Sequence, residues 1–221
     1  PSIGQVFDVN NKNNAEIIFA VHFNKEIVNE GHSYWYDITN LTDESGQAEA
    51  LVNCFTPGDT RKEMITYVKA ENKAYLMTKF LDTKNVSFNQ VGNDQILLRY
   101  ADVLLMYAEA LNELGYDASE GSIALKQLNA TRTRAGLTKL TAADVPTQES
   151  FRKAILDERQ KEFPYEGHRW FDLVRMGYAK SVLAIQGLNI QDYQLLFPIP
   201  QTEIEKVGDS KILWQNPGYD K

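Results

Sequence analysis

The segment Ile155–Gly177 constrains the fold of this chain more than any other stretch, because it combines dense charge with aromatic bulk. Its 23 residues include three arginines, three glutamates, two aspartates and one histidine, together with Phe163, Tyr165, Trp170 and Phe171. Side chains of these kinds at this density are typical either of a catalytic site or of a buried, ion-paired junction between helices. The choice between the two interpretations decides whether the chain is predicted to be an enzyme.

The pattern around this segment predicts a helix, a tight turn and a second helix. Thr147 is a suitable N-cap, and apolar residues follow it at helical spacing. Pro164 ends this helix, and Gly167 allows the turn. The second helix begins near His168 and ends before Gly177, because glycine is favoured directly after a helix.

Two acids on the first of these helices are the candidates for catalysis. Glu158 and Glu162 are four residues apart and share a helix face, and glycosidases use a pair of carboxylates. The alternative is that arginines of the same segment neutralise the acids at a packed corner. We favour this structural interpretation, because nearby arginines lower a pKa that a general acid needs raised.

The sequence therefore predicts no catalytic residue. It contains no nucleotide-binding glycine loop and no G-x-S-x-G nucleophile motif. The lone histidine of the charged segment is interpreted as a hydrogen-bonded turn residue rather than a general base. The predicted structural residues of the segment are Glu158, Arg159, Glu162, Glu166, His168, Arg169, Trp170 and Asp172.

Strand patterns are confined to the N-terminal part of the chain. Ile17–Phe23 carries apolar residues on both faces, which predicts a buried strand. Residues 24–59 are loop-rich. Met64–Lys69 and Ala74–Phe80 are rich in β-favouring residues and are separated by Glu71–Asn72, so we expect a hairpin.

A pair of helices is predicted in the middle of the chain. Ile96–Leu114 has one narrow polar stripe and is otherwise apolar or small, so we expect it to be packed on more than one side. Gly115 ends it. A second helix spans Ser122–Arg134, and its expected inward residues are Ile123, Ala124 and Leu128. The pair is typical of one tetratricopeptide-like unit, of which about three are needed for a stable array.

The C-terminal tail is predicted to be largely non-helical, because it contains Pro198, Pro200 and Pro217. Trp214 is the expected hydrophobic anchor of this tail.

One aromatic segment, His32–Asp37, has the composition of a ligand-binding loop. Its three consecutive aromatic residues cannot all lie on one face of a regular element, so at least one is expected to be exposed. The alternative, in which Trp35 fills the core, stays open. The predicted ligand-binding residues are His32, Tyr34, Trp35, Tyr36 and Asp37; weaker candidates are Arg61, Tyr67 and Tyr75.

The composition limits the kinds of partner that the chain is expected to bind. The formal net charge of −7 and the pI near 5.1 disfavour nucleic acid and anionic membrane surfaces. A hydrophobic content of 43% argues against disorder. Cys54 is the single cysteine, so no internal disulfide can form. The histidines at 22, 32 and 168 lack ligand spacing, and neither a metal site nor a cofactor is predicted.

The charged segment also carries a resemblance. ERQKEFPYEGHRWFDLVRMG, residues 158–177, resembles the C-terminal signature of the SusD/RagB family of outer-membrane nutrient-binding lipoproteins. Five further segments resemble the same family in the same order: Ala15–Phe23, Leu97–Gly115, Leu128–Leu137, Leu196–Ile204 and Gln215–Tyr219.

The resemblance implies a fold and a domain organisation. The expected fold is mainly α, a helical SusD-like region with one tetratricopeptide-like helix pair, small β elements near the N-terminal side and an irregular C-terminal tail. Residues 1–90 would hold the strand, loops and hairpin, residues 91–140 the helix pair, and residues 141–221 the signature helices and tail. Family members are longer, so residues 1–221 are expected to be the C-terminal region without the family's N-terminal half.

The resemblance also implies a function. The chain would not be an enzyme but would bind a nutrient, chiefly a glycan or oligosaccharide, at the outer-membrane surface. It would deliver this ligand to a SusC-like TonB-dependent transporter, and membrane contact would be made only through a lipid anchor that residues 1–221 lack. Two alternatives stay open: a glycoside hydrolase that uses the carboxylate pair, and a helical-repeat scaffold that binds protein.

Overall fold

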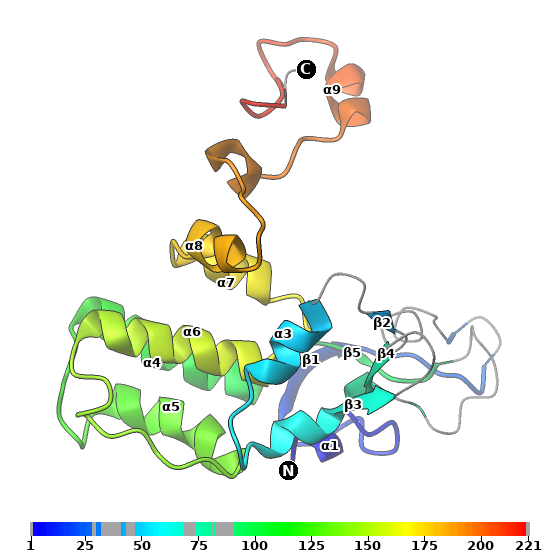
Figure 1. Cartoon of the computed structure of the whole chain (residues 1–221). Coiled ribbons are helices and arrows are strands. Elements are labelled where there is room, and N and C mark those ends of the chain that lie inside the picture. Colours follow the sequence, from blue (N-terminus) through cyan, green and yellow to red (C-terminus); the bar gives the residue numbers. More distant parts are fainter. Residues whose placement is uncertain are drawn as a thin grey trace. The chain divides into compact units, whose positions relative to one another are not determined.

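The structure is a computed structural model that describes residues 2–27, 30–31, 41–42, 47–68, 74–80, 82 and 91–219. Helices dominate it, and the prediction of a mainly α fold is confirmed (Figure 1). The chain divides into two compact units, residues 1–167 and 168–221, which are described separately below.

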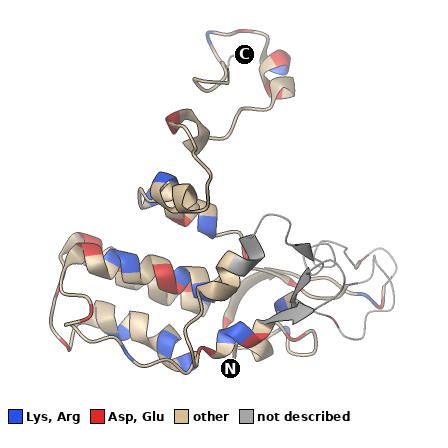
Figure 2. Ribbon diagram, viewed as in Figure 1, with Lys and Arg blue, Asp and Glu red and all other residues tan. Residues whose placement is uncertain are grey.

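Three long helices pack together in the first unit. They are α4 (Tyr100–Leu114), α5 (Ile123–Arg134) and α6 (Gln148–Glu162), and each packs against the other two (Figure 1). Acidic and basic residues alternate along α6 (Figure 2). The apolar residues buried in this helical layer include Ala101, Leu105, Ala108, Ala124, Leu125, Leu128, Phe151, Ile155 and Leu156.

The ends of these helices follow from local residue chemistry. Ser122 caps α5 by accepting a hydrogen bond from the Leu125 amide, and Thr147 caps α6 in the same way. Gly136, with φ of +78°, follows α5. A Cβ at this glycine would lie 3.2 Å from the carbonyl oxygen of Gly58. Glycine therefore lets the segment before residue 60 approach the end of α5 closely.

Two small antiparallel sheets complete the first unit. β1 (Ile17–Val21) pairs with β5 (Gln95–Arg99). In the second sheet β4 (Ala74–Met77) lies between β2 (Leu41–Thr42) and β3 (Ile65–Val68). β3 and β4 pair as the predicted hairpin, which is confirmed.

Short helical elements connect these sheets to a second hydrophobic core. They are α1 (Ile3–Val6), α3 (Gln47–Asn53) and the 3₁₀ turns η1 (Thr60–Met64) and η2 (Thr78–Phe80). This core comprises Ile3, Val6, Phe7, Met64, Phe80 and Val91. It therefore joins the N-terminal segment to the hairpin.

Two predictions about the strands are wrong. The predicted buried strand exists as β1, but Phe19 is 55% exposed, because β1 pairs only with β5 among the described strands. The helix expected from Ile96 begins four residues later, and Ile96–Arg99 belong to β5. An apolar run alone does not separate a strand from the helix that follows it.

Helix α4 packs against both α5 and α6, as expected of a helix packed on more than one side. Its large apolar side chains that remain 39–87% exposed are Tyr100, Val103, Met106, Tyr107 and Leu114. One prediction about helix packing is wrong. Ile123 is exposed, and Leu125 is buried in α5 together with Ala124 and Leu128. Ala124 and Leu128 share a face of α5 because they are four residues apart, whereas Ile123 lies on another side of the helix.

The second unit begins with α7 (Arg169–Arg175), which is followed by α8 (Ala179–Ile185), the 3₁₀ turn η3 (Asp192–Leu195) and α9 (Gln201–Val207). Gly177 follows α7 as predicted, with φ of +78°. Trp214 was the expected anchor of the tail, but it is 62% exposed, so that prediction is wrong. Tyr193 packs edge-to-face on Tyr219 instead, with ring centroids 5.0 Å apart.

Candidate functional site

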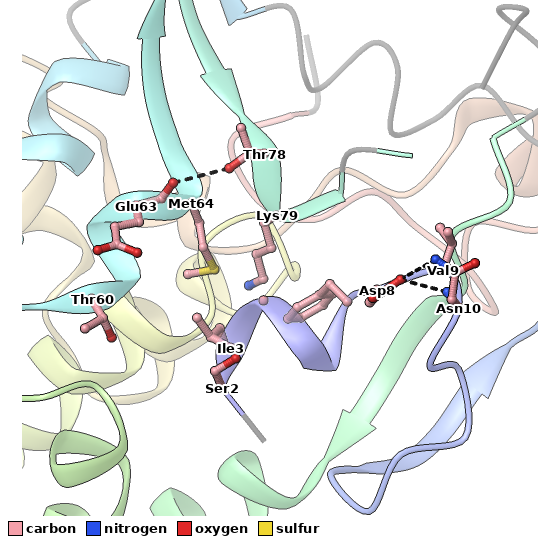
Figure 3. A pocket seen from close by; sticks show the side chains of 12 residues that line it. Ser2, Ile3, Asp8, Val9, Asn10, Thr60, Glu63, Met64, Thr78 and Lys79 are labelled. Carbon is pink, nitrogen blue, oxygen red and sulfur yellow. Dashed lines mark hydrogen bonds between the residues drawn. The ribbon is translucent and has the colours of Figure 1, made fainter. Parts of the chain in front are cut away.

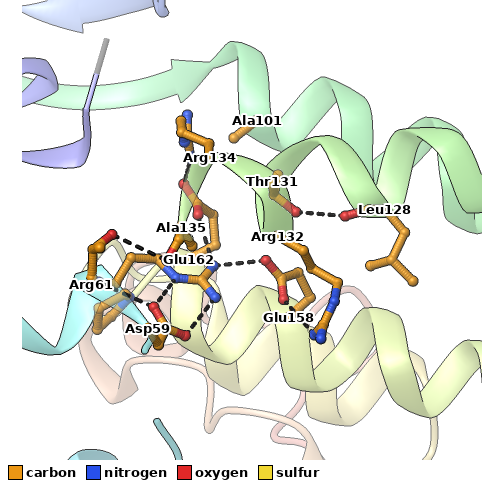
Figure 4. A network of polar contacts seen from close by, with 12 residues as sticks. Asp59, Arg61, Ala101, Leu128, Thr131, Arg132, Arg134, Ala135, Glu158 and Glu162 are labelled. Atoms are coloured by element: carbon orange, nitrogen blue, oxygen red, sulfur yellow. Dashed lines mark hydrogen bonds and ion pairs between the residues drawn. The ribbon is translucent and has the colours of Figure 1, made fainter. Parts of the chain in front are cut away.

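The most unusual site of the first unit is a buried charge network centred on Glu162, the last residue of α6 (Figure 4). Arg99 donates to its Oε1 at 2.5 Å, and Arg61 donates to its Oε2 at 3.0 Å. Arg134 also donates to Oε1. Three arginines from η1, β5 and α5 therefore converge on a single carboxylate.

Arg61 ties this carboxylate to the loop before η1. Its guanidinium donates to both Asp59 oxygens, at 2.9 and 2.8 Å, and to Glu158 Oε1 at 2.7 Å. The loop is held in place by the Thr60 amide, which donates to the Ala135 carbonyl at 3.0 Å. Because of the close approach at Gly136, Arg61 lies next to α6, where it bonds Glu158 and Glu162.

Arg99, the last residue of β5, makes the most extensive set of contacts. It donates to Glu166 Oε2 at 2.7 Å, to Glu16 Oε1 at 3.1 Å and to the Glu162 carbonyl at 2.6 Å. Its guanidinium also lies 4.4 Å from the centroid of the Phe163 ring. One buried arginine thus joins the segment before β1, the sheet and the turn after α6.

Lys79 of η2 belongs to the same charge network. Its ammonium is fully buried, donates to the Pro164 carbonyl at 3.1 Å and pairs with Glu166. The same nitrogen lies 4.5 Å from the centroid of the Phe7 ring. A buried ammonium at this position is stabilised by a carboxylate, a carbonyl and an aromatic face together.

The electrostatics of the network keep its acids ionised. Burial by itself would raise the pKa of Glu162, but the attraction of Arg99, Arg134 and Arg61 outweighs it and lowers that pKa to about 2. The pKa of Glu166 is lowered in the same way, against burial, by Arg99 and Lys79. Burial lowers the pKa of Lys79 to about 8, despite its pairing with Glu166. Glu162 therefore carries its charge at any physiological pH.

The predicted structural residues lie in both units. Glu158, Glu162 and Glu166 belong to the charge network, and Arg159 donates to Asp102 of α4 at 2.6 Å. The remaining four residues, which lie in the second unit, are His168, Arg169, Trp170 and Asp172. Asp172 accepts a hydrogen bond from Arg175 at 2.8 Å, and the ring centroids of Trp170 and Phe197 are 6.1 Å apart.

The sequence did not reveal most of the cations of the network. Arg61 was a weaker candidate for ligand binding, but it is 1% exposed and its guanidinium is committed to three carboxylates, so that prediction is wrong. The others that reasoning from sequence missed are Lys79, Arg99 and Arg134. A usable signal was the basic residue at the end of an element, since Arg99 ends β5 and Arg134 ends α5.

The predicted aromatic segment, with His32, Tyr34, Trp35, Tyr36 and Asp37, lies outside the described residues. The segment that precedes it is held to other parts of the first unit by charged contacts. Asp94 pairs with Lys12 at 2.7 Å and with His22 at 2.6 Å, and Lys25 pairs with Asp82 at 2.7 Å. The chain that follows it enters β2, which pairs with β4. Tyr67 and Tyr75 oppose each other in the hairpin register, and a binding role for them stays a prediction.

A pocket of about 520 Å³ opens beside Lys79, between α1, η1 and η2 (Figure 3). Ile3, Phe7, Val9 and Met64 provide its apolar lining. Its polar lining comes from Ser2, Asp8, Asn10, Thr60, Glu63, Thr78 and Lys79. The pocket has hydrogen-bonding groups of both kinds, but its aromatic ring, Phe7, is too buried to offer a stacking face.

Among the residues that the structure describes, no three His, Cys, Asp or Glu side chains are grouped so that they could hold a metal ion. No described helix combines the length and the hydropathy of a membrane-spanning segment.

Comparison with known proteins places the chain in a family. The sequence model of the SusD family matches residues 60–219, which contain α4, α5, α6 and most of the charge network. The chain belongs to the SusD family. This SusD-family region includes residues 158–177, the segment that resembles the family's C-terminal signature. The family prediction is therefore confirmed.

The chain is similar to SusD-like protein P2 of Formosa agariphila, with 36% identity over 140 residues that cover 58% of the chain and 26% of that protein. It is 31% identical to the starch-binding protein SusD of Bacteroides thetaiotaomicron over 147 residues, which cover 62% of the chain and 24% of that protein. Its fold is similar to that of surface glycan-binding protein A from Bacteroides fluxus, with a TM-score of 0.76, 26% identity, and coverage of 99% of the chain and 54% of that structure. The chain thus spans about a quarter of the length of these curated relatives and about half of the solved structure.

Proposed function

We propose that this SusD-family chain belongs to a protein that binds a glycan without transforming it. The observation that carries the proposal is the family match together with two relatives that are named for starch binding and for glycan binding. The acidic chain, with its net charge of −7, is suited to neutral sugars better than to polyanions.

A hydrolytic role suits the buried acids poorly. Glu158 and Glu162 are almost completely shielded from solvent and are committed to arginines. A general acid needs a raised pKa and access to the leaving group. Glu162 has a lowered pKa and is fully buried at the end of α6. These acids hold the fold together and are not available to a substrate.

The proposed glycan site is the aromatic segment His32–Asp37. Trp35 would offer a flat apolar face to the C–H groups of a sugar ring, and Tyr34 or Tyr36 would supply further stacking and hydroxyl groups. His32 and Asp37 would hydrogen-bond the sugar hydroxyls. Before the segment, Lys12 pairs with Asp94 and Lys25 pairs with Asp82, and after it β2 pairs with β4. These contacts support the proposal, because binding loops work best on a fixed framework.

The proposed setting is the outer surface of a bacterial outer membrane. Family resemblance supports a lipid anchor outside residues 1–221 and delivery of the glycan to a SusC-like TonB-dependent transporter. A pull-down from outer membranes of the source bacterium, with the polypeptide of the complete gene as bait, tests this setting. Recovery of a TonB-dependent transporter supports it, and recovery of no such protein contradicts it.

Binding is tested by titrating the polypeptide of the complete gene with a panel of soluble polysaccharides that includes starch. Trp35→Ala should reduce affinity for the bound glycan at least tenfold and leave the melting temperature nearly unchanged. Trp214→Ala is the matched control, because Trp214 is exposed and lies outside the aromatic segment. Equal loss of affinity in both variants, or a large fall in the melting temperature of Trp35→Ala, would remove the proposed site.

A further inference from the structure

A groove of about 720 Å³ lies between α5 and the segments that flank this helix in the sequence; we call it the α5 groove. After α5 the chain runs back along the helix before it enters α6 (Figure 1). The groove is lined by residues 120–121, by residues 139–141 and by one face of α5. The lining residues on α5 are Leu125, Lys126, Asn129, Ala130 and Thr133. Its volume is within the range of small binding sites in proteins.

Hydrogen bonds hold the returning segment against α5 and so define the shape of the groove. The side chain of Asn129 donates to the Leu140 carbonyl at 2.8 Å and accepts from the Leu140 amide at 2.8 Å. Glu120 Oε1 accepts a further bond from the Ala142 amide at 2.8 Å. Both walls are therefore tied together by side chains of the chain itself, and the groove is formed before any ligand binds.

The apolar lining of the α5 groove is aliphatic. It comes from Leu125, Ala130 and Leu140. Among the described residues that line the groove, none is aromatic, so it offers no stacking face to a sugar ring. A large apolar side chain of a ligand could instead be buried against the two leucines, which favours such a group as part of the ligand.

The charged lining of the groove favours an acidic ligand. Lys126 lies on α5 and Lys139 on the returning segment, and both are exposed. Within the part of the chain that the structure describes, neither ammonium group pairs with a carboxylate. Glu120 is the acidic residue of the described lining, and one of its oxygens accepts the Ala142 amide. Two ammonium groups on opposite walls therefore outweigh one carboxylate, although the whole chain has a net charge of −7.

We propose that the α5 groove binds an acidic peptide segment of another protein, in which aspartate or glutamate residues flank a large apolar side chain. The apolar side chain packs on Leu125 and Leu140, and the carboxylates pair with Lys126 and Lys139. A simple inorganic anion would leave the aliphatic lining unused, and a nucleic acid is repelled by the net charge of −7. The proposal is independent of the glycan-binding role, because the groove shares no residue with the aromatic segment.

Selection from a phage-displayed library of random dodecapeptides tests the chemistry of the ligand. The library is selected on the polypeptide of the complete gene and depleted on its Lys126→Glu, Lys139→Glu double variant. We expect the surviving peptides to carry aspartate or glutamate on both sides of a leucine or an aromatic residue. Survival of neutral or basic peptides would overturn the proposal. So would the survival of none, which would mean that the groove is covered or binds no peptide in the intact protein.

Fluorescence anisotropy with the most enriched peptide locates its binding site. The double variant Lys126→Glu, Lys139→Glu should bind the peptide at least tenfold more weakly. Ala130→Phe should weaken binding as much at an unchanged melting temperature, because it places a ring in the groove from an exposed position.

The matched control for charge is Lys62→Glu with Lys153→Glu, which reverses two exposed lysines elsewhere in the first unit. This control should keep the affinity for the peptide within twofold. A loss in the control equal to that in the double variant would mean that only the net charge matters, and it would overturn the proposal. Undiminished binding by Ala130→Phe would show that the peptide lies outside the groove, and would overturn it as well.

Discussion

Two ion pairs join the same two helices, α6 and α4, and they differ most in how deeply they are buried. Arg159 reaches Asp102 at 2.6 Å, with side chains that are 3% and 6% exposed. Arg152 reaches Glu113 at 2.6 Å, with side chains that are 24% and 43% exposed. The N–O distances are alike, and Arg152 also bonds the second Glu113 oxygen at 2.8 Å and pairs with Glu149 at 2.6 Å. The exposed pair is therefore not the weaker one by geometry, and burial is the difference to test.

Burial changes the consequence of losing one partner. A buried pair leaves an uncompensated charge when it is broken, and this charge cannot be hydrated without opening the fold. The partner of an exposed pair is simply hydrated. The end of α4 near Asp102 should therefore behave as part of the core, and the end near Glu113 as ordinary surface.

The largest effect is expected for Arg99→Ala. This change leaves Glu16, Glu162 and Glu166 without their shared guanidinium. We expect a loss of about 5 kcal/mol in the free energy of unfolding, the upper end for a broken buried pair. Chemical denaturation measures it. A loss below about 1 kcal/mol would show that the network is hydrated and contributes little.

Arg159→Ala should cost about 3 kcal/mol, because Asp102 remains buried without its partner. Urea denaturation of this variant sharpens the comparison between the two ion pairs. Asp102→Asn with Arg159→Met is the companion variant, since removal of both charges should restore part of the loss. A double variant as unstable as Arg159→Ala would indicate that packing, not charge, holds this contact.

Acid should weaken the network over a defined range. Glu162 has a pKa of about 2 in the folded chain and an ordinary value of 4.5. Its ionised form therefore stabilises the fold fully above pH 4.5, and this contribution is lost as the pH falls toward 2. The loss should be on the order of 3 kcal/mol. Denaturation at a series of pH values measures it, and Glu162→Gln should have a flatter dependence; parallel curves would contradict the account.

Arg152→Ala should have the smallest effect. Its partner Glu113 remains partly exposed and can be hydrated, so we expect a loss below about 1 kcal/mol that shrinks further in 0.5 M salt. Thermal denaturation of this variant beside Arg159→Ala completes the comparison. Equal losses in the two variants would show that burial is not what distinguishes these ion pairs.

Features that depend on neighbouring residues could be predicted from the sequence. The cap at Thr147, the helix end before Pro164, the turn at Gly167 and the hairpin of β3 and β4 are all present. Each is fixed by residues a few positions apart, so local chemistry is sufficient.

Features that depend on distant residues could not be predicted in the same way. Arg61 and Glu162 are 101 positions apart, and no periodicity joins them. β1 was expected to be buried because it is apolar, yet burial depends on which elements cover it. The binding role of the aromatic segment His32–Asp37 stays a prediction, because its residues lie outside the described structure.

We propose that the charge network stabilises the fold and that the aromatic segment His32–Asp37 binds the glycan. The most direct test measures the melting temperature and the affinity for the bound glycan in Glu162→Gln and in Trp35→Ala, within the polypeptide of the complete gene. Glu162→Gln should lower the melting temperature by roughly 10 °C and leave the affinity of the folded molecules within twofold. Trp35→Ala should do the reverse, with at least a tenfold loss of affinity at an unchanged melting temperature. A Glu162→Gln variant that keeps its melting temperature but loses the glycan would contradict the account.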